Sequence, residues 1–462
     1  MDYREEADTL GTVKVPAKAL WGPQTERSRH NFTTGPLMPM VLIRALLQLK
    51  RAAAIANRDL GEIQEAKAQL IIRATEDLLK LSDTQLQRDF PLRVYQTGSG
   101  TQTNMNVNEV IAHQTVTYDP TSGVLPNDDV NRGQSSNDTF PTAMAVTSTI
   151  AVNQLITQLD KLISELQMKQ QKYWQVVKIG RTHLQDATPL TFGQEISGWV
   201  STLQHDRDYL TSLAPTLGEL PIGGTAVGTG LNAAPGFATA VAAELSKAYQ
   251  QTFTADTNKF FGLAAHSGLT VVHGAIRTLA GDLLKIANDI RFLASGPRAG
   301  YNELNIPANE PGSSIMPGKV NPTQAEALTM AATRVMGNDV TISVAASQGN
   351  FELNVYKPVI IATFLESTDL LTGTIASFTT KLIQGLTVNA DRMSELVDQS
   401  LMTVTALSPH IGYHASAEIA QQAEREGTTL RAAAIQSGKV TAAQFDEWVD
   451  PLAMTNNDGT RN

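Results

Sequence analysis

The stretch PTAMAVTSTIAVNQLITQLDKLISEL, residues 141–166, decides the fold class of this chain. Its apolar residues recur at steps of three and four, which is the spacing of one buried stripe on an α-helix. They are Val152, Leu155, Ile156, Leu159, Leu162, Ile163 and Leu166. A helix unbroken from Pro141 to about residue 170 would be roughly 45 Å long. So long a stripe must be covered by other helices or by partner subunits.

Three further segments show the same spacing and predict further long helices. One follows Pro189 and reaches Leu210, one spans residues 279–290, and one follows Pro322 and reaches Met336. Alternating strand patterns with hairpin turns are scarce, and no periodicity typical of βαβ units is present. The sequence therefore predicts a mainly α fold with a central bundle of long helices.

The 462 residues exceed what one compact core usually holds, so several regions are expected. We predict a mixed, mostly helical N-terminal domain over residues 1–135 and a central helix bundle over 136–388. A small helical C-terminal domain over 389–462 follows a break in the pattern near Asn389. A more charged composition begins there.

Composition limits the chemistry. The net charge of -9 argues against a protein that neutralises nucleic-acid phosphates, so a small anionic substrate would need a local counter-charge. The chain has no cysteine, which excludes disulfides, thiolate nucleophiles and cysteine-ligated zinc or iron–sulfur centres. No spacing of histidines and carboxylates indicates a metal site, so we expect neither a metal nor an organic cofactor.

Targeting and membrane signals are weak. The first six residues, MDYREE, are acidic and unlike a secretory or transit peptide. The apolar stretch over residues 41–49 is interrupted by Arg44 and is too short to span a bilayer. We expect a cytoplasmic protein with no membrane partner.

Four polar, glycine-containing segments interrupt the helical pattern, and three of them precede a proline expected in the first turn of a helix. The segments are GSGTQTNMN (98–106), QSSNDT (134–139), GRTHLQDAT (180–188) and GSSIMPGKVN (312–321). Free amides and the helix dipole at such N-termini favour a carboxylate. Ordinary helix capping would explain one Ser–Asn pair, but a whole run of hydroxyl and amide side chains favours a binding site.

Individual residues in these segments have competing interpretations. His183 is a candidate for proton transfer because imidazole titrates near neutral pH, and a hydrogen-bonded structural histidine is the alternative. Asn321 resembles a helix cap before Pro322. The last segment is not a P-loop, because five residues separate Gly312 from Gly318 and Val320 replaces the required Ser or Thr.

At these four segments the chain resembles the fumarase/aspartase superfamily, and its similarity to class II fumarases covers nearly the whole length. The segment 312–321 matches a signature highly specific to that superfamily. Further matches are LWGPQT (20–25), DDVN (128–131), GNFELN (349–354) and TAL (405–407). Aspartases usually have Gln at the position of His183 and Ala before Lys319, so both positions favour fumarase. The resemblance implies a homotetramer with a central core of twenty helices and active sites shared by three subunits.

The resemblance also implies a carbon–oxygen lyase that reversibly hydrates fumarate to (S)-malate by stereospecific trans addition. Ser313 would be the base on a mobile loop bracketed by glycines, and His183 paired with Glu326 would be the acid. A first-turn residue that satisfies the helix dipole is the structural alternative for Glu326. Lys319 and Asn321 would hold the substrate carboxylate. The other residues implied in substrate binding are Ser99, Gly100, Thr101, Ser135, Ser136, Asn137, Thr182, Ser314 and Val320.

The sequence departs from the family pattern at one expected binding site. Many fumarases carry His-Pro-Asn-Asp at a second anion site, where this chain has Leu125, Pro126, Asn127 and Asp128. We therefore expect a weakened second site.

Two alternative functions remain. An ammonia-lyase acting on aspartate is the first alternative, and a non-catalytic scaffold with the same fold is the second.

Overall fold

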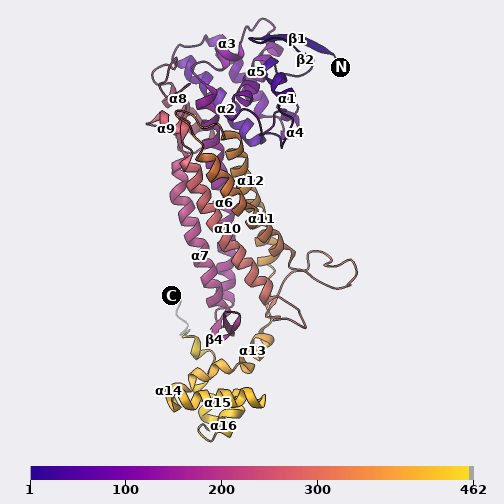
Figure 1. Ribbon diagram of the computed structural model, residues 1–462, viewed down its shortest axis with the longest axis vertical. Helices are drawn as coiled ribbons and strands as arrows, with labels where there is room; N and C mark the ends of the chain where they lie inside the picture. Colours follow the sequence, from indigo (N-terminus) through magenta and orange to yellow (C-terminus); the bar gives the residue numbers. More distant parts are fainter. Residues whose placement is uncertain (1, 457–462) are drawn as a thin grey trace. The chain divides into compact units, whose positions relative to one another are not determined.

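The computed structural model describes residues 2–456, and its ribbon is mainly helical, which confirms the predicted fold class (Figure 1). The chain divides into two compact units. Unit 1 comprises Met1–Ile156, Tyr209–Thr278 and Arg334–Leu370. Unit 2 comprises Thr157–Asp208, Leu279–Thr333 and Leu371–Asn462. The division into three domains at residues 135 and 388 remains a prediction.

In unit 1, α2 (Met40–Asp59) is the central N-terminal helix, and it packs on α3 (Glu65–Leu79), α5 (Thr101–Tyr118) and α8 (Phe237–Tyr249). Its apolar residues, such as Leu42, Leu46 and Leu49, are buried. The remaining N-terminal elements of this unit are β1 (Tyr3–Asp8), β2 (Gly11–Pro16), α1 (Pro23–Asn31), α4 (Asp83–Leu86) and the π-helical turn Pro126–Val130. The later ones are β5 (Glu219–Leu220), β6 (Thr254–Ala255) and α9 (Lys259–Ala264).

Five long helices contribute residues to both units. They are α6 (Ser136–Lys172), α7 (Phe192–Leu213), α10 (Ser267–Leu293), α11 (Thr323–Ala346) and α12 (Lys357–Phe378). The stripe predicted on α6 is buried except at Ile156, which is half-buried, and the helix continues to Lys172. Within unit 1, His273 of α10 bonds Asp339 of α11 and Ser367 of α12. The predicted bundle of long helices is confirmed.

Two of the three helix starts predicted at proline are wrong. Helix α6 begins at Ser136, so Pro141 lies inside it. Proline removes the N–H that would bond the Asn137 carbonyl, and the Lys357 Nζ amine donates to that carbonyl instead (3.2 Å). Pro189 lies in β4 (Gln185–Thr191), a position that a two-stranded ribbon tolerates. Pro322 directly precedes Thr323, the first residue of α11.

A hairpin formed by β3 (Val177–Thr182) and β4 carries the predicted histidine, where the sequence indicated a loop before a helix. The two residues of its turn are His183 and Leu184, with φ angles of 57° and 61°. Two left-handed residues form a type I′ turn, whose usual sequence is Asn-Gly or Asp-Gly. That signal is absent here, so local sequence patterns did not predict the hairpin.

The remainder of unit 2 includes a short pair of strands, β7 (Leu304–Asn305) and β8 (Thr387–Val388), and then α13 (Ala390–Gln399). The C-terminal helices are α14 (Ser408–Ile411), α15 (Tyr413–Glu426), α16 (Leu430–Gln436) and α17 (Ala442–Trp448). They share a small apolar core that includes Leu407, Ile419, Leu430 and Phe445.

One described helical stretch, Lys357–Ile383, is long and apolar enough to cross a membrane by length and composition alone. Half of its apolar window is buried inside the protein, and its first residue, Lys357, is fully buried. A core helix passes the same test, so this stretch is weak evidence for a membrane span.

Candidate active site

The predicted residues of unit 1 meet at the first turns of α5 and α6. A pocket of about 1010 Å³, here called the unit 1 pocket, is lined there by Thr101, Asn127, Asp128, Ser135, Ser136 and Asn137. Ser99 adjoins this group, because its Oγ lies 2.8 Å from the Thr101 Oγ1. Leu125 and Pro126 do not line the pocket.

Glycine allows the turn before α5 to pack against its neighbours. Gly100 has a φ of +80°, and an added Cβ would lie 2.2 Å from the Phe140 ring of α6. At Gly98 an added Cβ would lie 1.3 Å from the Val355 carbonyl oxygen. Larger residues at these positions would push the α5 turn away from both segments, so the glycines set the shape of the pocket wall.

Two asparagines that sequence analysis did not assign fix the Ser136 side chain. The Asn104 Nδ2 donates to the Ser136 Oγ (3.0 Å) and to the Asn131 Oδ1 (3.1 Å). The Asn104 Oδ1 accepts from the Thr139 Oγ1 (3.1 Å). Asn104 lies three residues after Thr101, on the same face of α5, and this spacing was the available signal.

The start of α6 is suited to an anion. The Ser135 Oγ accepts from the Asn137 amide (3.2 Å), while the Ser136 amide has no acceptor within residues 2–456. That amide lies at the positive end of a 37-residue helix. The hydroxyls of Ser135, Ser136 and Thr101 add donors around it. The unit 1 pocket can therefore bind a carboxylate.

In unit 2, the hairpin that carries Thr182 and His183 is anchored at its base. Arg181 pairs with the fully buried Glu303 (2.5 Å), and the buried Lys178 contacts Glu303 (3.4 Å) and Glu195 (2.8 Å). The ion pair with Glu303 raises the pKa of Arg181 against the opposing effect of burial. This network holds the turn so that His183 is exposed in a left-handed conformation. Such a strained, non-glycine turn is typical of functional sites.

Residues 312–321, here called the serine loop, are closed at their base. The Gly312 amide donates to the Lys319 carbonyl (2.9 Å), and the Asn321 Nδ2 donates to the Gly312 carbonyl (2.6 Å). An added Cβ at Gly312 would lie 2.4 Å from the Lys319 oxygen, so only glycine fits. Gly318 turns the loop with a φ of +81°. Asn321 is not the predicted helix cap, since no helix amide in the described chain donates to its side chain.

The side chain of Ser313 accepts hydrogen bonds from two backbone amides of its own loop. Its Oγ accepts from the backbone amides of Ile315 (3.2 Å) and Met316 (3.0 Å). Two amides that point at one oxygen stabilise negative charge on it. These two contacts would stabilise an alkoxide at Ser313 if one formed, whereas the neighbouring Ser314 is exposed and has no such contacts within the described residues.

A second pocket of about 650 Å³, the unit 2 pocket, is lined by Lys319, Val320, Asn321 and Glu326. Arg291 of α10 lies in the same wall. Thr182, His183, Ser313 and Ser314 are not among its lining residues. Within the part of the chain that the structure describes, the side chains of His183, Lys319 and Glu326 form no hydrogen bond or ion pair. They are available to a ligand or to another subunit.

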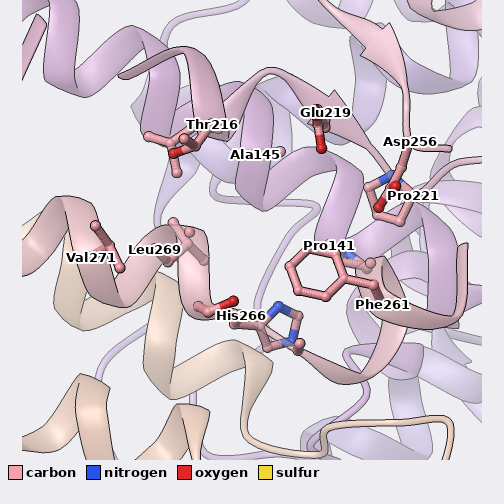
Figure 2. A pocket seen from close by; sticks show the side chains of 15 residues that line it. Pro141, Ala145, Thr216, Glu219, Pro221, Asp256, Phe261, His266, Leu269 and Val271 are labelled. Carbon is pink, nitrogen blue, oxygen red and sulfur yellow. The ribbon is translucent and has the colours of Figure 1, made fainter. Parts of the chain in front are cut away.

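A third cavity, of about 350 Å³, contains none of the predicted residues (Figure 2). Figure 2 labels His266, Phe261 and Pro141 among the residues that line it. Burial lowers the pKa of His266 to about 3, so its ring is neutral at physiological pH. This cavity is not the predicted site.

No group of three or more His, Asp or Glu side chains in residues 2–456 is arranged to hold a metal ion.

Comparisons with known families and proteins show what this chain is similar to. Residues 11–337 match the family model described as Lyase, and residues 404–456 match the one described as Fumarase C C-terminus. The class II fumarate hydratase of Listeria monocytogenes serotype 4b (strain F2365) is 56% identical over 455 residues, covering 98% of this chain and 99% of the relative. That of Bacillus subtilis (strain 168) is 53% identical over 460 residues, with the same coverage.

Solved structures show the same similarity. A recombinant class II fumarase from Schistosoma mansoni has a TM-score of 0.94 and 42% identity, covering 98% of this chain and 99% of that one. A fumarate lyase:delta crystallin from Brucella melitensis has a TM-score of 0.93 and 37% identity, covering 98% of this chain and 100% of that chain. The chain therefore belongs to the class II fumarate hydratase family.

Proposed function

We propose that this protein catalyses the reversible trans hydration of fumarate to (S)-malate, with Ser313 as the base. The observation that carries this assignment is the pair of amide hydrogen bonds to the Ser313 Oγ. Serine is otherwise too weak a base to remove a proton from carbon, and these amides favour its alkoxide. The identity of 51–56% to class II fumarate hydratases supports the same reaction.

In the dehydration direction, the Ser313 alkoxide takes the proton from the carbon next to one carboxylate of malate. Negative charge then accumulates on that carboxylate, and Lys319 stabilises it. The Asn321 side-chain amide has a second N–H besides the one bonded to Gly312, and this N–H can donate to the same carboxylate. In this proposal the charge is balanced by protein groups, without a metal or an organic cofactor.

His183 protonates the leaving hydroxyl, directly or through a water molecule, with Glu326 as its carboxylate partner. No hydrogen bond joins the two side chains within the described residues, so we propose that the pair forms between subunits. Their unpaired state in the single chain supports this assembly.

We further propose a homotetramer with a twenty-helix core, in which each active site takes residues from three subunits. Ser99, Gly100, Thr101, Ser135, Ser136 and Asn137 would orient one end of the dicarboxylate, together with Thr182, Ser314 and Val320. Helix α11 exposes Met330, Val340 and Val344 by 67%, 65% and 56%, and apolar surface of this kind favours burial against another copy. A chain without cysteine also suits the cytoplasm, where we place the enzyme.

The reaction is tested by the loss of ultraviolet absorbance when the purified protein is mixed with fumarate. We expect loss with fumarate alone and no acceleration when ammonia is added. A requirement for ammonia, with aspartate as the product, would instead identify the ammonia-lyase that shares this fold.

Sharing of active sites predicts complementation between inactive variants. Ser313→Ala and His183→Asn proteins should each be inactive, and a mixture that is dissociated and reassembled should regain part of the activity. Some sites then combine an intact serine loop with an intact hairpin. Dilution that dissociates the tetramer should abolish activity in parallel. If mixed tetramers form, as measured by mass, and no activity returns, the sites are not shared.

The second anion site is expected to be weak. Leu125 offers no donor from its side chain, and its backbone amide already donates to the Asp129 carboxylate (2.8 Å). Asp128 and Asp129 add negative charge. Lys67 forms an ion pair with Asp129 but not with Asp128. A dicarboxylate soaked into crystals should therefore occupy the main site beside Ser136 and leave residues 125–128 empty. Ordered density for the ligand against Pro126 and Asn127 would contradict this.

A further inference from the structure

Two fully buried lysines lie behind the segments that line the unit 1 pocket. Lys50 of α2 and Lys357 at the start of α12 are both 0% exposed. A buried ammonium group is costly unless it is compensated, so two of them close to one site require an explanation. The assigned chemistry uses neither residue.

Lys50 organises the chain that leads into Ser135. Its Nζ donates to the Asn131 Oδ1 (2.8 Å) and to the Gln134 Oε1 (2.9 Å). Asn131 in turn bonds Asn104, which holds the Ser136 hydroxyl. The amine of Lys50 is therefore separated from the Ser136 Oγ by only two side chains.

Lys357 joins the two substrate-binding segments of unit 1. Its Nζ donates to the Asn137 carbonyl (3.2 Å), which Pro141 leaves without a helical partner. Its backbone amide donates to the Gly98 carbonyl (3.2 Å) in the turn before α5. Lys357 thus helps to fix the positions of both the 135–137 segment and the 98–101 segment.

Asp138 is the buried anion that faces both lysines. Its carboxylate accepts from the amides of Ser135, Gly223 and Thr225, each at 2.9 Å. Burial raises the pKa of Asp138, and the three amide donors oppose that shift because they stabilise the ionised carboxylate. When both amines are protonated, the two lysines and the Asp138 carboxylate together carry one excess positive charge, behind a pocket in which the serine, threonine and asparagine residues predicted to orient the substrate are neutral.

We propose that Lys50 and Lys357 are positioning residues of the hydratase reaction, which shape the 98–101 and 135–137 segments from behind and supply the positive charge that selects a dicarboxylate. This inference rests on the proposed function. The lysines do not touch the substrate. They act through Asn131, Gln134 and Asn137 and through their field, which is strong because the surroundings are dry.

The charge of the two amines should depend on whether substrate is bound. Burial lowers the pKa of each lysine to about 7, although Asp138 opposes the shift. Two other titratable groups interact with this cluster. The charge of Lys357 disfavours the protonated form of His266, and the charge of Asp138 favours the protonated form of Lys259. At pH 8 the amines of the free enzyme are mostly neutral, and a bound dianion favours their protonated form. Binding should therefore take up protons.

The test measures the binding of succinate to the intact enzyme by titration calorimetry at pH 8. Succinate is a dicarboxylate that the enzyme cannot convert. Titrations in HEPES and in Tris, whose ionisation enthalpies differ, give the number of protons taken up. We expect uptake by the unmodified enzyme. Lys50→Met and Lys357→Met should each reduce the uptake and weaken succinate binding at least tenfold, with a similar loss in kcat/KM for fumarate.

Lys169→Met is the matched control. The Lys169 Nζ also donates to backbone carbonyls, those of Gln384 and Leu386, but it lies in unit 2 and outside both pockets. This variant should bind succinate and turn over fumarate within twofold of the unmodified enzyme. Methionine has a similar shape to lysine, so folding should survive, and thermal unfolding and tetramer mass check this.

The outcomes separate the two proposals. If the Met variants fold and retain succinate affinity and kcat/KM within twofold, or lose activity with unchanged affinity and proton uptake, the positioning role is wrong. If neither variant folds, proton uptake on succinate binding is measured with the His183→Asn enzyme, which keeps both lysines but lacks the histidine. An absence of uptake there also overturns the inference. Failure of the unmodified enzyme to hydrate fumarate would refute the proposed function instead, since succinate binding still tests the lysines.

Discussion

Replacing Ser313 by alanine is expected to lower kcat for fumarate hydration by roughly 10³-fold or more, because the variant loses the base that exchanges a proton with carbon. Substrate affinity should change little, since the hydroxyl acts chiefly in the transition state. Steady-state kinetics and succinate titration measure the two effects separately.

Loss of the hydroxyl also frees the amides of Ile315 and Met316, so a loosened loop must be distinguished from a lost base. Ser313→Thr provides this control because it keeps an oxygen that can accept from both amides. It should retain more activity than the alanine variant. Retention of most of the unmodified rate by Ser313→Ala would exclude Ser313 as the base.

The second large effect is expected at His183, where asparagine should lower the rate by about 10²-fold or more. Asparagine is the appropriate replacement because it tolerates the left-handed conformation that His183 adopts, so the turn is preserved. The pH–rate profile should also lose one limb. For malate dehydration this is the limb on which activity falls with rising pH, because the protonated ring is the proton donor.

Leu184→Asn is the control for this prediction. Leu184 occupies the second left-handed position of the same turn, and its exposed side chain has no assigned role. Its replacement changes the turn sequence without removing an acid, so near-normal activity is expected. Both limbs persisting in the His183→Asn profile would mean that another residue carries the proton.

Local sequence patterns were sufficient to predict the helical framework and to recognise the family. The stripe on α6 predicted a long buried helix because a period of three to four is set by helix geometry alone. The serine loop was recognisable for a similar reason. Its glycines meet constraints within ten residues, as the close approach of Gly312 to the Lys319 carbonyl demonstrates.

Proline was the misleading signal. Pro141 and Pro189 both suggested helix starts, yet one lies within α6 and the other in a hairpin strand. Whether proline ends a helix depends on what satisfies the carbonyl one turn earlier. For Pro141 the donor is Lys357, which no local pattern could identify.

The sequence by itself determined that the chain is a helical member of this family and that residues such as Ser313 and His183 are candidates for catalysis. Only the tertiary structure decided that two amides converge on the Ser313 Oγ and that His183 lies in a strained hairpin turn. It alone brought Lys50 and Lys357 behind the same segments. Hydrogen-bond partners and burial come from segments far apart in the chain, so these properties exist only after folding brings the segments together.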